Sequence, residues 1–400
     1  MRMRLYVLIL LGVLVLGCLL FLPGQVVLLR AGEMLSPDEI IARQQQDDAL
    51  YFGLAEAPGN YKFVAYAKYK PDIVILGSSR AHHERQEFFS LPSYTMSGVI
   101  YTPADAIETM DLLLLVHKPK YVIYNLDFFT FCTRDPGIAA QKIFSRPHGK
   151  PNTGWAWVTS NRFRLVPDLI RTGRLAPRDA LNLALGRFDR KPANVSLIGM
   201  SALLEQRGFR RDGSLSTVHA VAQDRAQMQA AYDEPRMGAW HFEGGCSFDP
   251  QAMAHLQMFQ DEMTRKGIIL ILHMPPISPR MYQLFMAARP DVVDYYRTFL
   301  LQALRRHFPY LYNHVDGAMI GALESEFDDA VHGGDVAEAR SILAAAKQPG
   351  SALAPIVNRA FLERLTRERR GNLDVELAYF RNVHSVAGGA FAPHLPPAKP

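Results

Sequence analysis

The stretch Pro71-Asp-Ile-Val-Ile-Leu-Gly-Ser-Ser-Arg80 decides the fold class of this 400-residue chain. A short apolar run over residues 73–76 ends at Gly77, which predicts a buried strand followed by a tight turn. The turn places Ser78 and Ser79 just beyond the carboxyl end of the strand, where parallel α/β sheets present their reactive edge. Ser79 is therefore a candidate nucleophile, although turn and helix-capping roles for both serines remain open.

Short apolar runs alternate with amphipathic stretches on either side of this segment. Such an order predicts an α/β fold with a parallel sheet and helices on both faces, specifically a flavodoxin-like three-layer sandwich. The predicted strands lie at residues 73–76, 93–96, 120–125, 267–273 and 310–315, and the predicted helices at 103–116, 249–266, 291–307, 336–347 and 354–369.

The composition and the hydrophobic pattern of the sequence change several times along the chain. Ser36 and Pro37 form a typical helix start, with Ser36 as the N-cap and Pro37 in the first helical position. The predicted organisation is a transmembrane anchor (1–30), a stalk (31–70), an α/β domain (71–350) with an insertion or cap (130–245), and a C-terminal helix with a disordered tail (351–400).

The N-terminal residues predict how the chain is placed relative to a membrane. Leu5 to Leu22 is apolar and uncharged, which is near the minimum length for a spanning helix. Arg2 and Arg4 precede it, so we expect a single-pass inner-membrane protein whose main domain lies on the extracytoplasmic, periplasmic side. A cleaved signal peptide is the alternative.

Composition excludes several classes of function. The formal charge of +5 is spread along the chain, without the clustered basic face that nucleic-acid binding needs. The cysteines, at positions 18, 132 and 246, form no zinc-type cluster, so no metal or cofactor is predicted, and pairing of Cys132 with Cys246 stays open.

A candidate base for Ser79 lies in Phe327-Asp-Asp-Ala-Val-His-Gly333. Asp329 and His332 are three residues apart on one turn, close enough for a hydrogen bond that fixes the imidazole tautomer and stabilises its cation. Each motif taken alone also fits a surface turn. Their joint occurrence at the two ends of an α/β pattern favours a Ser79–His332–Asp329 triad.

The order of these motifs resembles the SGNH (GDSL-type) hydrolase superfamily, in particular a membrane-anchored branch whose first block reads Gly-Ser-Ser-Arg. The likeness covers about residues 71–135 and 250–345. It implies that Ser79 is the nucleophile, that Gly98 in Thr95-Met-Ser-Gly98 donates its N–H to an oxyanion hole together with Ser79, and that His332 is the base oriented by Asp329.

The same resemblance implies a serine esterase or O-acyltransferase that acts on an acylated envelope or exported polysaccharide. The expected acyl group is acetyl. A membrane protein that supplies activated acyl groups is the expected partner of a transferase. Two alternatives remain: a non-catalytic envelope scaffold or glycan-binding protein with the same fold, and an unrelated α/β protein in which Ser79 and His332 lie far apart.

The third block of the family pattern is altered here to Tyr124-Asn-Leu-Asp127. Asn125 is a candidate oxyanion donor, but the alternation of the strand can turn it away from Ser79. Asp127 is expected either to pair with Arg80 or to act in catalysis. His273, at the end of a predicted strand, is either a pocket residue or a packed histidine.

Overall fold

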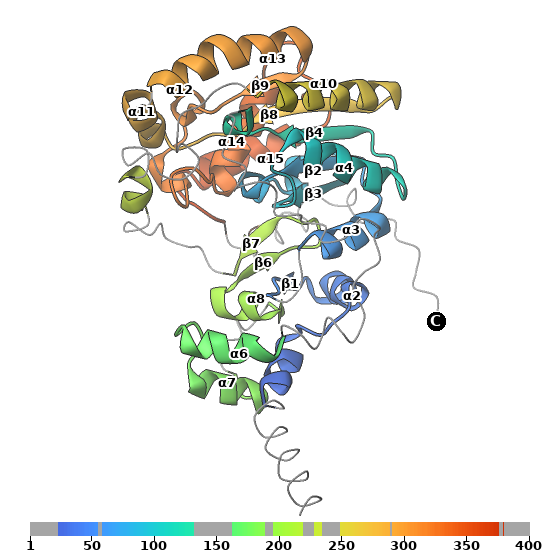
Figure 1. Cartoon of the computed structure of the whole chain (residues 1–400), viewed down its shortest axis with the longest axis vertical. Helices are drawn as coiled ribbons and strands as arrows, with labels where there is room; N and C mark the ends of the chain where they lie inside the picture. Colours follow the sequence, from blue (N-terminus) through green and yellow to red (C-terminus); the bar gives the residue numbers. More distant parts are fainter. Residues whose placement is uncertain are drawn as a thin grey trace, which may run out of the picture.

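The computed structural model describes residues 23–54, 58–131, 162–188, 195–218, 228–233, 249–288, 290–375 and 379. Within these residues the chain is an α/β protein with two sheets, drawn in Figure 1. The larger sheet holds the candidate site, and the smaller one lies beside it.

The larger sheet has five strands, and every neighbouring pair is parallel. Its order is β3-β2-β4-β8-β9, so the strand that comes first in the sequence lies between the second and the third. All five strands lie where the sequence predicts them, with bounds β2 Ile73–Gly77, β3 Ser93–Ser97, β4 Tyr121–Asn125, β8 Ile269–Met274 and β9 Leu311–Asn313.

Alternate residues of the central strands enter two different cores. Val74 and Leu76 pack with the helices on one face, whereas Ile73 and Ile75 pack with α14 and α15 on the other, and all four are fully buried. Burial of both faces explains why the strand reads as a continuous apolar run. The first face carries α3 (Pro58–Tyr69), α4 (Pro103–Leu114), α10 (Pro250–Arg265), α11 (Pro279–Ala288), α12 (Pro290–Asp294), the π-helix η6 (Tyr295–Leu300) and α13 (Leu301–His307), and the second face carries α14 (Asp335–Ala346) and α15 (Arg359–Glu368).

The smaller sheet joins the segment predicted as a stalk to the predicted insertion. Strand β1 (Leu50–Tyr51) pairs in parallel with β5 (Leu197–Ile198) and antiparallel with β6 (Arg207–Phe209), which forms a hairpin with β7 (Leu215–Thr217). Helices α2 (Pro37–Asp47) and α8 (Met200–Glu205) flank it (Figure 1). Ser36 caps α2 as predicted, in a reciprocal capping box with Glu39.

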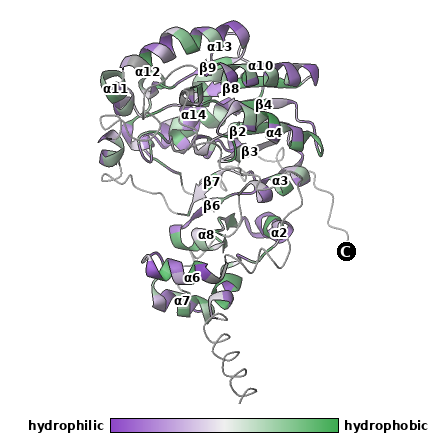
Figure 2. Ribbon diagram, viewed as in Figure 1, coloured by the Kyte–Doolittle hydropathy of each residue, from purple (hydrophilic) through white to green (hydrophobic). Residues whose placement is uncertain are grey.

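Part of the predicted membrane anchor packs against the insertion. Residues 1–22 lie outside the described residues, and residues 23–31 are helical. Val27 and Leu28 are buried in one apolar cluster with α6 (Arg162–Arg171) and α7 (Pro177–Ala184), which Figure 2 displays as amphipathic helices at the far end from the larger sheet. None of the helices in the described part of the chain has the length and apolar character that a bilayer crossing requires.

Other predictions also fall outside the described residues. They concern Cys18, Cys132 and Cys246, and the C-terminal stretch 392–400. The predicted helix at 291–307 is present, but it is interrupted by the π-helical segment η6.

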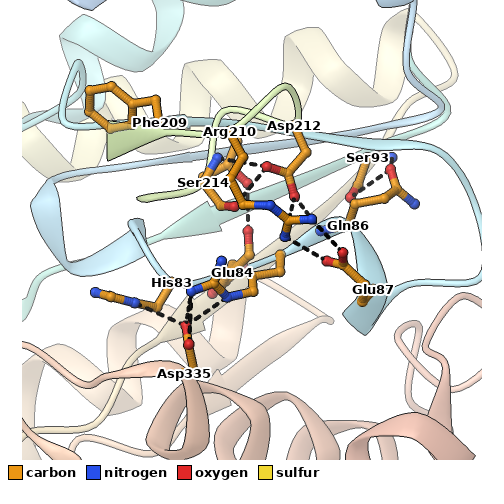
Figure 3. Close-up of polar contacts among 12 residues, drawn as sticks. His83, Glu84, Gln86, Glu87, Ser93, Phe209, Arg210, Asp212, Ser214 and Asp335 are labelled. Carbon is orange, nitrogen blue, oxygen red and sulfur yellow. Dashed lines mark hydrogen bonds and ion pairs between the residues drawn. The ribbon is translucent and has the colours of Figure 1, made fainter. Parts of the chain in front are cut away.

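A buried ion pair fastens the smaller sheet to the larger domain. The Arg210 guanidinium, at the β6–β7 turn, donates to both carboxylate oxygens of Glu87 at 2.7 and 3.1 Å. Asp212, in the same turn, accepts from the backbone N–H of Gln86 at 2.9 Å. Figure 3 shows Arg210 and Asp212 pointing toward this segment. The fork geometry of arginine suits such a paired, desolvated contact.

We expect Arg210→Gln to destabilise the chain by about 3–5 kcal/mol, because the Glu87 carboxylate then stays buried without its cation. Urea unfolding measures the change. The double variant Arg210→Gln/Glu87→Gln is the matched control, and it should recover part of the loss. A single variant as stable as the native chain would show that the ion pair does not fasten the sheet.

Candidate functional site

The turn after β2 presents Ser79. Ser78 caps the 3-10 helix η1 (Ser79–Ala81), its hydroxyl accepting from the Arg80 N–H at 3.3 Å. Gly77 has no room for a side chain, because a Cβ there would lie 2.9 Å from Asn125 Cβ and 3.0 Å from Ala81 Cβ. The strand therefore turns sharply at glycine and leaves Ser79 half-buried at the sheet edge.

The structure brings Ser79, His332 and Asp329 together. Ser79 Oγ lies 2.7 Å from His332 Nε2, although 253 positions separate the two residues. His332 Nδ1 lies 2.7 and 2.8 Å from the two carboxylate oxygens of Asp329. With Nδ1–H donated to Asp329, Nε2 is the nitrogen that accepts the Ser79 proton. The His332 and Asp329 side chains are 23% and 25% exposed, so the site is open to a ligand.

A tight turn holds Asp329 under His332. Asp329 Oδ1 also accepts the backbone N–H of His332 at 3.0 Å and of Val331 at 3.3 Å. Ala330, which follows Asp329 in this turn, has a φ of 68°, a left-handed conformation that is uncommon for alanine. Strain of this kind is retained where surrounding structure demands it, commonly at functional sites. The geometry selects Asp329 over its neighbour Asp328 as the partner of the imidazole.

The environment keeps Asp329 ionised. Its burial favours the neutral acid, but hydrogen bonds and charge from His332 and from the turn amides prevail, and the pKa of the carboxyl is lowered below its usual value. An ionised Asp329 is the state that stabilises a protonated His332.

Arg80 ties the two turns together. It is 2% exposed, and its guanidinium donates to Asp127 Oδ1 at 2.6 Å and to Val331 O at 3.1 Å. It also donates to the carbonyls of Pro275 and Pro276, while Ser78 Oγ donates to Asp127 Oδ2 at 2.7 Å. Of the two roles that the sequence left open for Asp127, the structure places it as the partner of Arg80 and Ser78.

The predicted oxyanion donors are placed differently. The Gly98 N–H donates to Gly77 O at 3.0 Å and Ser78 O at 3.1 Å, so this amide is already engaged. The Asn125 carboxamide is buried, with its Oδ1 2.6 Å from His273 Nδ1. Ser79 opens a 3-10 helix, and the first amide of a helix has no partner within it.

His273 is a buried, hydrogen-bonded histidine. It is fully buried, and Nε2 lies 2.6 Å from Ser341 Oγ on α14. Of the two roles expected for His273, the structure therefore shows the packed histidine. It lies beneath the site and not on its open side.

His82 is the neighbour of the triad that sequence reasoning did not assign to the site. It lies one turn after Ser79, and its Nδ1 is 2.7 Å from Ser97 Oγ. Ser97 Oγ in turn lies 3.0 Å from the buried Lys62 Nζ. Burial, with further contributions from Lys62, His83 and His332, holds the pKa of His82 well below its usual value, so the ring is neutral. Its spacing of three residues from Ser79 was the available signal.

The lowered pKa of Asp329 sets a pH dependence of stability. A carboxyl whose pKa is lower in the folded chain contributes stability above its unfolded value of about 3.9, and loses it as the pH falls through the folded pKa. We expect Asp329→Asn to melt below the native chain at pH 7, with the difference shrinking in more acidic buffer. Thermal melts from pH 7 to pH 3 test this, and a constant difference would contradict the assignment.

Known proteins provide no assignment for this arrangement. A scan against protein-family models finds no match, and neither the curated proteins nor the solved structures contain a significant match to the chain. The chemistry of the site therefore rests on its geometry.

Proposed function

We propose that the protein is a serine-dependent acyl esterase or O-acyltransferase in which Ser79, His332 and Asp329 form the catalytic triad. The single observation that carries the proposal is the continuous hydrogen-bonded line from Ser79 Oγ through the His332 ring to Asp329, with contacts of 2.7, 2.7 and 2.8 Å. Nucleophile, base and orienting carboxylate in that geometry are the arrangement by which a serine hydroxyl becomes reactive.

The first half of the reaction forms an acyl-enzyme. Ser79 Oγ attacks the ester carbonyl carbon while its proton passes to His332 Nε2, and Asp329 stabilises the imidazolium. The tetrahedral intermediate then collapses, the bond to the alcohol oxygen breaks, and His332 returns the proton to the leaving alcohol. In the second half, water or a sugar hydroxyl attacks the acyl group and gives its proton to His332, which restores Ser79.

The oxyanion requires donors other than those that the family resemblance suggests. The Ser79 amide is one. The second that we propose is His82: if Ser97 O–H donates to Nδ1, the neutral ring carries its proton on Nε2, the nitrogen not bonded to Ser97. The ring lies one turn after the nucleophile and beside Gly98, where an added Cβ would be 2.9 Å from the ring Cε1, and we propose that Nε2 meets the substrate oxygen there. One such donor typically contributes about 3 kcal/mol of barrier lowering.

Two further observations support membership of the SGNH superfamily. The strand order of the larger sheet, second-first-third-fourth-fifth in sequence, is the flavodoxin-like doubly wound order. Ser79 follows the first strand of that sheet and His332 follows the last, the positions that the resemblance assigns to them.

The substrate class and location rest on the resemblance and the N-terminal sequence. We propose an O-acylated, in particular acetylated, envelope or exported polysaccharide as substrate, a membrane-anchored protein with its α/β domain on the periplasmic side, and a membrane acyl-donor protein as partner if the reaction is a transfer. The proposed chemistry uses no cofactor.

The alternative is a non-catalytic envelope scaffold or glycan-binding protein with the same fold. The engaged amide of Gly98 and the contact of the Asn125 carboxamide with His273 favour it, because both groups already have partners within the protein. Against it stands the open, correctly oriented triad, which a binding role alone does not require.

Covalent labelling of the full chain with a fluorophosphonate probe tests the nucleophile. We expect the native chain to be labelled, and Ser79→Ala and His332→Gln to lose labelling, because the first lacks the reacting oxygen and the second its base. Ser90→Ala, which changes an exposed serine elsewhere, is the matched control and should label as the native chain does. Equal labelling of native and Ser79→Ala protein would leave the scaffold as the better description.

We expect His82→Ala to slow hydrolysis of an aryl acetate about 10²- to 10³-fold through kcat, since an oxyanion donor acts in the transition state. His82→Gln, which keeps an N–H donor, should retain more activity than His82→Ala. The exposed His307→Gln is the control for histidine loss. If His82→Ala changes only KM, the ring does not serve the oxyanion.

A further inference from the structure

Three buried ionisable side chains meet beneath the turn that carries His332. Glu84 follows the Ser79 turn, His273 lies near the carboxyl end of β8, and Glu338 lies in the first turn of α14. All three are fully buried, and one ligand atom from each lies within 4.8 Å of the others. No part of the proposed acyl transfer uses them.

The two carboxylates of this cluster lack the partners that burial demands. Glu84 Oε1 lies 3.2 Å from His273 Nδ1, but Glu84 Oε2 and both oxygens of Glu338 have no hydrogen-bond partner among the residues that the structure describes. Arg80 favours the ionised form of Glu338 through its charge, yet its hydrogen bonds go to Asp127 and to backbone carbonyls. An uncompensated buried carboxylate costs several kcal/mol.

Protonation of Glu338 is one way to lower the cost of this arrangement, and a bound cation is the other. Burial, followed by the charge of Glu84, raises the pKa of Glu338 well above its usual range. A protonated Glu338 would carry no charge, yet neither of its oxygens has a hydrogen-bond partner among the described residues. A positive ion between the side chains would give both carboxylates a partner through one ligand atom each.

We propose that Glu84, His273 and Glu338 bind one divalent transition-metal cation, in particular Zn²⁺. Two carboxylates neutralise the charge of the ion, and one imidazole nitrogen with carboxylate oxygens is a donor set that suits Zn²⁺, with Mn²⁺ as the nearest competitor. Asn125 Oδ1 lies 2.6 Å from His273 Nδ1, so the ring donates to it when no cation is bound, and the cation would replace that proton. Ser341 Oγ, 2.6 Å from His273 Nε2, would accept the remaining ring proton once the cation binds Nδ1.

A second cluster shows why the first requires a cation. His83, Asp335 and Asp374 also lie within ligand distance of one another. There, however, Arg85 donates to both oxygens of Asp335 at 2.7 and 2.8 Å. His83 Nδ1 lies 3.0 Å from the same carboxylate, and Figure 3 shows His83 beside Asp335. The guanidinium already supplies the positive charge that the first cluster lacks.

The cation would brace the catalytic turn from beneath. A Cβ on Gly333, the residue after His332, would lie 2.7 Å from Glu338 Oε1, so the cluster abuts the turn directly. Binding would tie the start of α14 to β8 and to the segment after Ser79. The role is structural, because the three ligands are buried and lie outside the Ser79–His332 contact.

Metal analysis of the full chain, purified without chelators, tests the site independently of any activity. We expect about one zinc or manganese ion per chain by inductively coupled plasma mass spectrometry, a lower Tm after removal by chelator, and recovery of the Tm on adding Zn²⁺. A native chain that carries no metal and whose Tm responds to neither chelator nor Zn²⁺ overturns the proposal.

The variant Glu338→Gln is expected to change the Tm in opposite directions with and without a bound cation. With a bound cation, it loses the metal and melts below the native chain. Without one, it replaces an unpartnered buried acid by a neutral amide of the same shape, and the Tm stays or rises. Glu363→Gln, at an exposed carboxylate on α15, should keep the metal and the native Tm. Retention of the metal by Glu338→Gln also overturns the assignment, and if that variant does not fold, the measurements on the native chain decide.

Discussion

The buried guanidinium of Arg80 is the contact on which the candidate site depends. It joins Asp127 after β4, the backbone of the turn between Asp329 and His332, and the carbonyls after β8. Arginine suits this role because its planar fork offers five donors in fixed directions and keeps its charge when buried. Ser79 is the preceding residue, so the anchor that holds the base turn also sets the position of the nucleophile.

Burying such a cation is tolerated because a carboxylate accompanies it. The same solution recurs at Arg85 with Asp335 and at Arg210 with Glu87, each desolvated and each linking segments far apart in sequence. Pairs of this kind are costly to break and confer little net stability, so their value lies in fixing which segments meet. Glu84 and Glu338 depart from this pattern because no arginine or lysine side chain is hydrogen-bonded to them among the described residues. A bound metal ion would supply the missing positive charge.

Much of the larger sheet was predictable because its signals are local. Strands buried on both faces read as apolar runs ended by glycine or polar residues, and β2, β4 and β8 are of this kind. The smaller sheet was not, because β1 and β5 have two residues each and pair across almost 150 positions. Two residues hold no periodicity, and the segment therefore read as a stalk.

The sequence by itself determined the positions of the five strands, the turn presenting Ser79, and the link between Asp329 and His332, since each depends on residues a few positions apart. Only the tertiary structure decided that Ser79 meets His332, that Asn125 turns toward His273, that the Gly98 amide is engaged, and that Glu84, His273 and Glu338 converge. Strand alternation sets which face a side chain occupies, but its partner on that face comes from another segment. That partner is fixed only when the layers pack.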